Sequence, residues 1–180
     1  MSGFTLVPSA GAKVRGSTLS ALFSERTPIY AFLSTNQPYT SNNTPADVTD
    51  LVAALSANAT YDFMFHLFAS SAANAAGDVQ YRFTFPALAA VDVGSVGPHN
   101  SLASGTNADI EAFAATNDSS SPTASFPFGT STSVTGSHLH VRIVVGATAG
   151  NLQLQASQFA SNINTTTLLA NSYLVGERVL

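Results

Sequence analysis

The sequence predicts an all-β protein: an antiparallel β-sandwich of the jelly-roll type, with about eight strands and a short N-terminal arm. Three observations lead to this prediction. Long runs alternate apolar and polar residues with a period of two, which is the periodicity of half-buried strands. Clusters of Gly, Pro, Asn and Ser separate these runs. No segment has the spacing of a long amphipathic helix.

The chain is long enough for one domain with a sizeable core, because it has 180 residues and 45% of them are apolar. We expect residues 1–26 to form an arm and residues 27–180 to form a single β-sandwich domain. Only 9% of the residues are charged, so Ser, Thr, Asn and Gln must supply most of the polar surface. Hydroxyls and amides that find partners are easier to bury than ions. Such a surface suits a subunit that packs against others, or a merely neutral protein.

The distribution of charge excludes several partners. Six basic residues are scattered among ten acidic ones, so the chain has no basic cluster that would bind a phosphate backbone. The chain has no cysteine, which removes disulfides, thiolate metal sites and thiol catalysis. Residues 143–176 carry no charge, but their many Asn, Gln, Thr and Ser side chains could not be satisfied in hydrocarbon. We expect neither nucleic acid nor a membrane as a partner.

The first strand candidates lie at residues 28–35 and 48–55, separated by a turn rich in Asn and Pro. Two aromatic-rich strands follow at residues 61–68 and 79–85. On one face of these two strands we expect large core side chains: Tyr61, Phe63, Phe65, Leu67, Val79, Tyr81, Phe83 and Phe85. Each of them contributes roughly 1.5–3 kcal/mol when it is buried. Pro86 ends the second strand, because proline has no N–H for the ladder.

The other face of the strand at residues 61–68 is apolar where a solvated strand would be polar. Met64 and Phe68 flank His66 on this face, and we expect Arg82 to lie near them. We interpret this outer stripe as a subunit contact, because exposed apolar side chains in a row favour an interface.

Weaker strand candidates lie between residues 87 and 137, at "AAVDVG", "DIEAFAAT" and "FPFGTST". The run "HLHVRIVV" is a stronger one, with four core side chains on one face: Leu139, Val141, Ile143 and Val145. The segment "GATAG" then reverses the chain into a strand at residues 151–159, and the last strand lies within residues 167–180.

His138 and His140 share the other face of their strand, roughly 7 Å apart along it. Two imidazoles can begin a metal site, but a third ligand would have to come from His66, His99, Glu177 or an aspartate. The sequence shows no tight cluster of this kind, so we expect no metal and no cofactor, with the two imidazoles bonded to their neighbours. A trimer axis that brings three copies together stays an open alternative.

The sequence contains no G-x-S-x-G elbow and no helices that could hold one. The segment at residues 129–137 is rich in Gly and Ser but lacks the Lys of a phosphate loop. We therefore expect no catalytic residues and a protein that is not an enzyme. A metal-dependent enzyme of the cupin type is the most distant alternative.

Four stretches, taken in their order and spacing, resemble a jelly-roll module of tailed-bacteriophage virion proteins: "LSANATYDFMFHLFASS", "AAGDVQYRFTFPA", "GATAGNLQLQASQ" and "TTTLLANSYLVGERV". This module occurs at the end of minor tail proteins and in small head-associated proteins. The positions that match are Asn58, Thr60, Tyr61, Phe63, Gly77, Asp78, Phe83, Pro86, Gly146 to Gly150, Ser172, Tyr173 and Leu174. The chain departs from the family pattern at Asn171, where the family tends to have Gly, and in having no Trp.

The resemblance implies a structural or binding role without catalysis. Because a short arm replaces the long anchor of tail proteins, it favours a capsid decoration protein. Such a protein would form a homotrimer, contact the major capsid protein of the same phage and stabilise the exterior of the head after assembly in the host cytoplasm. The alternative is a tail-fibre or baseplate module that binds a receptor or a host-surface glycan. Its groove could use Tyr39, Phe113, Phe126 and Phe128, although these rings more simply anchor loops to the sandwich.

Overall fold

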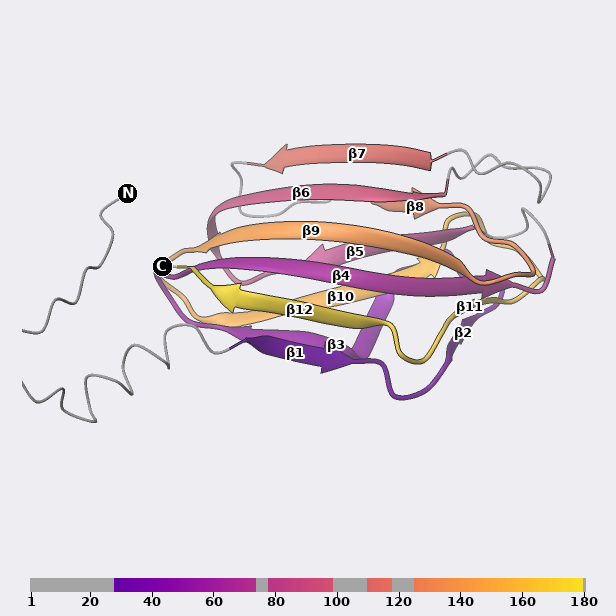
Figure 1. The fold of residues 1–180 in the computed structure, drawn as a ribbon, viewed down its shortest axis with the longest axis horizontal. Helices are drawn as coiled ribbons and strands as arrows, with labels where there is room; N and C mark the ends of the chain where they lie inside the picture. Colours follow the sequence, from indigo (N-terminus) through magenta and orange to yellow (C-terminus); the bar gives the residue numbers. More distant parts are fainter. Residues whose placement is uncertain (1–27, 74–77, 99–109, 118–124, 180) are drawn as a thin grey trace, which may run out of the picture.

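The structure is a computed structural model, and it describes residues 28–73, 78–98, 110–117 and 125–179 (Figure 1). The predicted arm, residues 1–26, lies outside the described residues. Within them no helix is long and apolar enough to cross a membrane.

The described residues form twelve strands in two antiparallel sheets. The strands are β1 (Ile29–Phe32), β2 (Gln37–Tyr39), β3 (Ala46–Leu55), β4 (Thr60–Ser71), β5 (Val79–Thr84), β6 (Leu88–Pro98), β7 (Ile110–Asn117), β8 (Phe126–Phe128), β9 (Thr135–Val145), β10 (Gly150–Gln158), β11 (Thr166–Leu168) and β12 (Tyr173–Arg178). The first sheet has the order β1-β12-β4-β9-β6-β7, and β11 pairs with the end of β4 and with β2. The second sheet has the order β3-β10-β5-β8. The prediction of an all-β antiparallel sandwich is confirmed.

The chain passes back and forth between the two sheets. It moves from β3 in the second sheet to β4 in the first, then to β5 in the second, and later from β8 to β9 to β10 in the same alternation. The resulting orders β1-β12-β4-β9 and β3-β10-β5-β8 are consistent with a jelly roll. The strands outnumber the eight or so expected because the hairpin β6–β7 extends the first sheet and the short strands β2 and β11 add a pair (Figure 1).

The core lies between the sheets, and the period of two decides which side chains enter it. From Tyr61 to Ser71 of β4 buried and half-buried residues alternate, and along β9 buried residues alternate with mostly exposed ones. The rings of Phe65 on β4 and Phe83 on β5 meet across the core with centroids 5.0 Å apart. Because each sheet contributes one apolar face to this layer, the remaining face of each sheet points outward.

Two turns place asparagine in the left-handed region of backbone conformation. Asn58, before β4, has a φ of 54°, and Asn171, before β12, has a φ of 68°. Asparagine tolerates this region better than other residues with a Cβ atom. The same geometry explains why Asn171 can stand where the resembling phage family tends to have Gly. Its N–H donates to the carbonyl of Leu33, which fixes the entry to β12 beside β1.

The glycine on β12 gives a test of the packing. A Cβ atom on Gly176 would lie 2.1 Å from Cδ1 of Phe63 and 2.6 Å from the carbonyl oxygen of Asp62. We expect Gly176→Ala to lower the free energy of unfolding by about 1–3 kcal/mol, because overpacking forces a buried ring and the backbone apart. Urea unfolding monitored by fluorescence or circular dichroism measures this change.

The matched control is Gly94→Ala on β6 of the same sheet, where an added Cβ atom meets nothing within 4 Å. This variant should have wild-type stability or slightly more, since alanine loses less backbone entropy than glycine in a strand. Equal destabilisation by the two substitutions would contradict the packing of Phe63 against Gly176.

Candidate interaction surface

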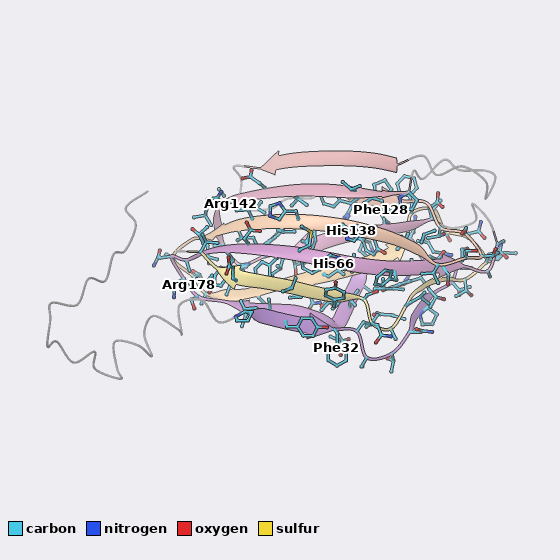
Figure 2. The ribbon with its side chains drawn as sticks, viewed as in Figure 1. Phe32, His66, Phe128, His138, Arg142 and Arg178 are labelled. Carbon is cyan, nitrogen blue, oxygen red and sulfur yellow. The ribbon has the colours of Figure 1, made fainter. Side chains whose placement is uncertain are left out.

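The outer face of the first sheet carries a row of aromatic and apolar side chains that crosses five adjacent strands. The antiparallel register places Phe32 of β1 opposite Tyr173 of β12, Tyr173 opposite His66 of β4, and His66 opposite His138 of β9. Val96 of β6 continues the row beside His138. We call these five residues the aromatic row. Phe32, His66 and His138 are labelled in Figure 2.

The rings of the row pack against one another. The imidazole of His66 stacks on the ring of Tyr173, with centroids 4.5 Å apart and planes 16° apart. His138 meets His66 edge to face at 4.7 Å. Tyr30 lies two residues before Phe32 on β1. Its ring centroid is 6.2 Å from that of Phe32 and 5.8 Å from that of Tyr173. Tyr173 and His66 stack between neighbouring strands, so their ring planes are roughly perpendicular to the sheet and their ring edges point outward.

This face exposes large apolar side chains on several strands. Tyr30 is 61% exposed and Phe32 is 53% exposed, both on β1. Val96 and Val175 add exposed aliphatic surface on β6 and β12. Single exposed apolar residues are normal, but a contiguous group on one face marks an interaction site.

A charged row borders the apolar one. Glu177, Asp62, Arg142 and Asp92 lie in register on β12, β4, β9 and β6. His140 lies between the rows, and its Nε2 is 2.5 Å from Oδ1 of Asp62. A hollow of about 270 Å³ opens at this border. Its lining consists of Pro28, Asp62, Met64, His140, Val175, Gly176 and Glu177.

Only three of the four residues predicted for the outer stripe lie together in the structure. Met64, His66 and Phe68 lie half-buried on the outer face of β4, as expected from their spacing. The expectation that Arg82 lies near them is wrong. Arg82 belongs to β5 in the second sheet and points away from the core on the opposite outer face, because its neighbours Tyr81 and Phe83 are buried. The two aromatic strands face each other across the core instead of lying side by side.

The residues proposed for the core lie between the sheets, except that Phe85 is only partly buried at the edge of the core. His138 and His140 share the outer face of β9, and the register brings His66 to His138. Among the described residues no group of three His, Cys, Asp or Glu side chains could hold a metal ion. His99, one of the other ligands considered, lies outside the described residues.

Three of the four rings considered for a glycan groove are described by the structure, and these three do not line one. Tyr39 on β2 and Phe126 and Phe128 on β8 are buried in the core. The side chain of Phe113 lies outside the described part of the structure. The anchoring role that we preferred for these rings therefore fits the three that the structure describes.

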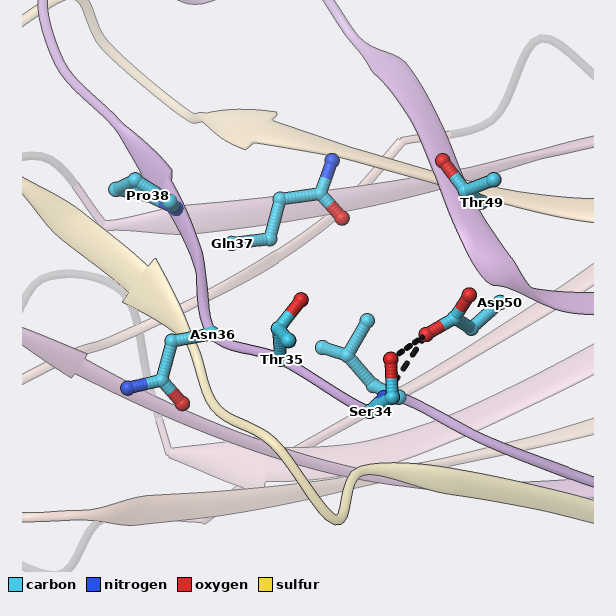
Figure 3. Close-up of a pocket in the computed structure, with 8 residues that line it drawn as sticks. Ser34, Thr35, Asn36, Gln37, Pro38, Thr49 and Asp50 are labelled. Atoms are coloured by element: carbon cyan, nitrogen blue, oxygen red, sulfur yellow. Dashed lines mark hydrogen bonds between the residues drawn. The ribbon is translucent and has the colours of Figure 1, made fainter.

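A second hollow, of about 210 Å³, lies beside the turn between β1 and β2 and is shown in Figure 3. There the carboxylate of Asp50 accepts hydrogen bonds from the Ser34 hydroxyl at 2.6 Å and the Ser34 amide at 2.9 Å. These bonds lower the pKa of Asp50 below its usual value. No histidine lines this hollow, and the hydrogen bonds between Ser34 and Asp50 tie the turn to β3.

Sequence reasoning missed Tyr30, Phe32, Tyr173 and Val175 as parts of the outer face. The signal was present, because "IYAF" and "YLV" are apolar at consecutive positions. A strand with one solvated face alternates apolar and polar residues, so consecutive apolar residues indicate that both faces make contacts.

The outer face of the second sheet carries polar side chains, unlike the aromatic row on the first sheet. Asn151, Gln153 and Gln155 of β10 point outward there. The Gln155 amide donates to Oδ1 of Asp47 at 2.7 Å, and the Gln153 amide donates to the carbonyl of Val48 at 2.8 Å. This face is polar and internally bonded. The large apolar side chains that are exposed on described strands, namely Tyr30, Phe32, Val96 and Val175, all belong to the first sheet.

No protein-family model matches the chain, and no curated protein matches its sequence. Among solved structures, the chain is similar to VP2 of infectious bursal disease virus in a subviral particle, at 8% identity and a TM-score of 0.23. That match covers 86% of this chain and 41% of the other. A structure of the Gx strain of the same virus gives 11% identity, a TM-score of 0.22 and coverage of 85% and 40%.

The chain thus spans about two fifths of the length of the structures it matches. TM-scores this low do not establish a common fold.

The environment of His66 predicts a pH dependence of stability. Burial, and secondly the neighbouring His138, lower the pKa of His66 below its usual 6.5. Near pH 6.5, and down to the lowered pKa of the folded state, the unfolded chain therefore binds more protons than the folded one, and folding stability falls as the solution is acidified through this range. We expect the free energy of unfolding to fall more between about pH 7.5 and pH 5 in the wild type than in His66→Gln.

Urea unfolding at both pH values measures the difference within each protein, so a change in baseline stability does not confuse the comparison. Identical losses of stability on acidification in the wild type and His66→Gln would contradict the desolvated state of His66.

Proposed function

We propose that the protein is a non-enzymatic structural component of a tailed-bacteriophage virion, and specifically a capsid decoration protein. The observation that carries the proposal is the exposed apolar face of the first sheet, on a sandwich whose other face is polar. The sequence resemblance to virion jelly-roll modules supports the same role. In this proposal the protein binds the exterior of the phage head as a homotrimer and stabilises it.

The chemistry of the two faces supports assembly through the first sheet. Tyr30, Phe32 and Val175 would lose solvent-exposed area in a contact, which is favourable by about 25 cal/mol for each Å² of apolar surface. A row of charged side chains borders these apolar groups on the same face: Glu177, Asp62, Arg142 and Asp92. A partner would have to leave this row in solvent or offer groups of opposite charge to it, because ions are costly to bury unpaired. The major capsid protein of the same phage is the second proposed partner.

The centre of the row suits a protein partner. Tyr173 and His66 each cover one face of the other there, which leaves a sugar little ring face to stack on, whereas Tyr30 and Phe32 at the edge of the sheet keep exposed rings. The edges of Tyr173 and His66 offer a hydroxyl and ring nitrogens, which suit hydrogen bonds with a protein surface. The buried positions of Tyr39, Phe126 and Phe128 also give no support to the receptor-binding alternative.

Substitution of Met64 tests the oligomer contact. We expect the wild-type protein to be a trimer, and Met64→Lys to shift it toward the monomer, because an ammonium group in an apolar contact loses its hydration. Met64 is only half-buried in the single chain, so the fold should persist. Size-exclusion chromatography with light scattering measures the mass, and thermal unfolding checks the fold.

The matched control is Asn151→Lys, which places the same group on an exposed position of the polar sheet. This variant should assemble as the wild type does. A wild type that stays monomeric at high concentration, or a Met64→Lys variant that assembles normally, would count against the proposed contact.

The position of the protein on the virion tests the decoration role itself. We expect electron microscopy of purified, antibody-labelled particles to show label distributed over the head, as a protein that reinforces the shell requires. Label restricted to the tail tip would instead support the receptor-binding alternative. Particles without label would reject the virion role.

A further inference from the structure

We propose that the hollow at the border of the charged row binds an arginine side chain of a protein partner. The hollow has a volume of about 270 Å³, and most of the side chains that line it come from β4, β9 and β12 of the first sheet. This inference rests on the proposed function, because it names the chemistry that a partner in the virion would present to this face.

Part of the lining is apolar. Met64 of β4 and Val175 of β12 are directly paired in the hollow, and Pro28, just before β1, lines it as well. Met64 is half-buried and Val175 is 37% exposed. The aliphatic stem of a long basic side chain can cover such a surface while its charged head reaches a polar group beyond it.

Two carboxylates lie next to the apolar part of the lining. Asp62 of β4 and Glu177 of β12 are directly paired, two residues along their strands from Met64 and Val175. Like charges at opposed positions destabilise a sheet, and a cation between them removes this repulsion. The Cβ atoms of opposed residues are about 4.5–5.5 Å apart. One planar guanidinium, which has five N–H donors in a fixed fork, can therefore donate to both carboxylates.

The two carboxylates keep the capacity to accept further hydrogen bonds. Oδ1 of Asp62 is bonded to Nε2 of His140, and within the described residues neither this carboxylate nor that of Glu177 has another partner. Arg142, which is in register with both Asp62 and Asp92, does not line the hollow. At neutral pH two carboxylates outweigh one imidazole in either of its protonation states. The hollow is therefore negative and complementary to an arginine.

Titration of the isolated full-length protein with N-acetylarginine methylamide, followed by nuclear magnetic resonance, tests the site. The chain has only two methionines, Met1 and Met64, so the methyl signal of Met64 reports directly from the hollow. We expect this signal to shift saturably, with a dissociation constant in the millimolar range. N-acetylcitrulline methylamide is the matched ligand, because it has nearly the same shape without the charge, and it should bind about fivefold more weakly.

Variants show which carboxylates hold the arginine. Asp62→Asn and Glu177→Gln should each weaken binding by about two- to fivefold, as the loss of one exposed ion pair requires. Asp92→Asn is the matched control, because it removes the same charge from the same row at a position outside the hollow, and it should retain wild-type affinity.

Absence of a saturable shift, equal binding of the citrulline compound, or an equal loss of affinity in Asp92→Asn would overturn the arginine site. Such a result would leave the decoration role standing, since labelling of particles tests that role separately. Particles without label, together with normal arginine binding by the isolated chain, would reject the role and keep the site.

Discussion

The contact between Phe65 of β4 and Phe83 of β5 is the constraint on which the rest of the structure depends. These strands are close in sequence, yet they lie in different sheets, and their rings meet across the core with centroids 5.0 Å apart. The short connector must therefore cross from one layer to the other. Once it does, β4 and β5 present their remaining faces to opposite sides of the molecule. The position of every outward side chain on the two strands follows from this crossing.

The two outer faces differ in how their central strands satisfy the outward side chains. Strand β4 is central in its sheet, so its outer residues Met64 and His66 lie between β12 and β9 and are half-buried by their neighbours. Such positions tolerate apolar and aromatic side chains, which pack well on a pleated surface. On the second sheet, Gln153 and Gln155 of β10 satisfy their amides with β3 and need no external partner.

The alternation of residues was sufficient to predict the sandwich and the inward faces of the strands. Leu139, Val141 and Ile143 are buried where a period of two places them, because side-chain direction in a strand is a local property. The pairing of strands is not local. Nothing in the sequence near Arg82 indicates that β5 lies next to β10 instead of β4, and this is why Arg82 was assigned to the wrong face. The partners of His66 were hidden for the same reason.

The pairing register of the strands brings residues that are distant in the sequence together on one surface. Phe32, Tyr173, His66 and His138 are far apart in the chain, and only the antiparallel pairing of four strands brings them into one row. Within it the stack of Tyr173 on His66 covers one face of each ring and leaves edges that donate and accept hydrogen bonds. A surface of this kind is apolar enough to gain from burial and polar enough to fix the orientation of a partner. The same row can therefore provide both contact area and specificity.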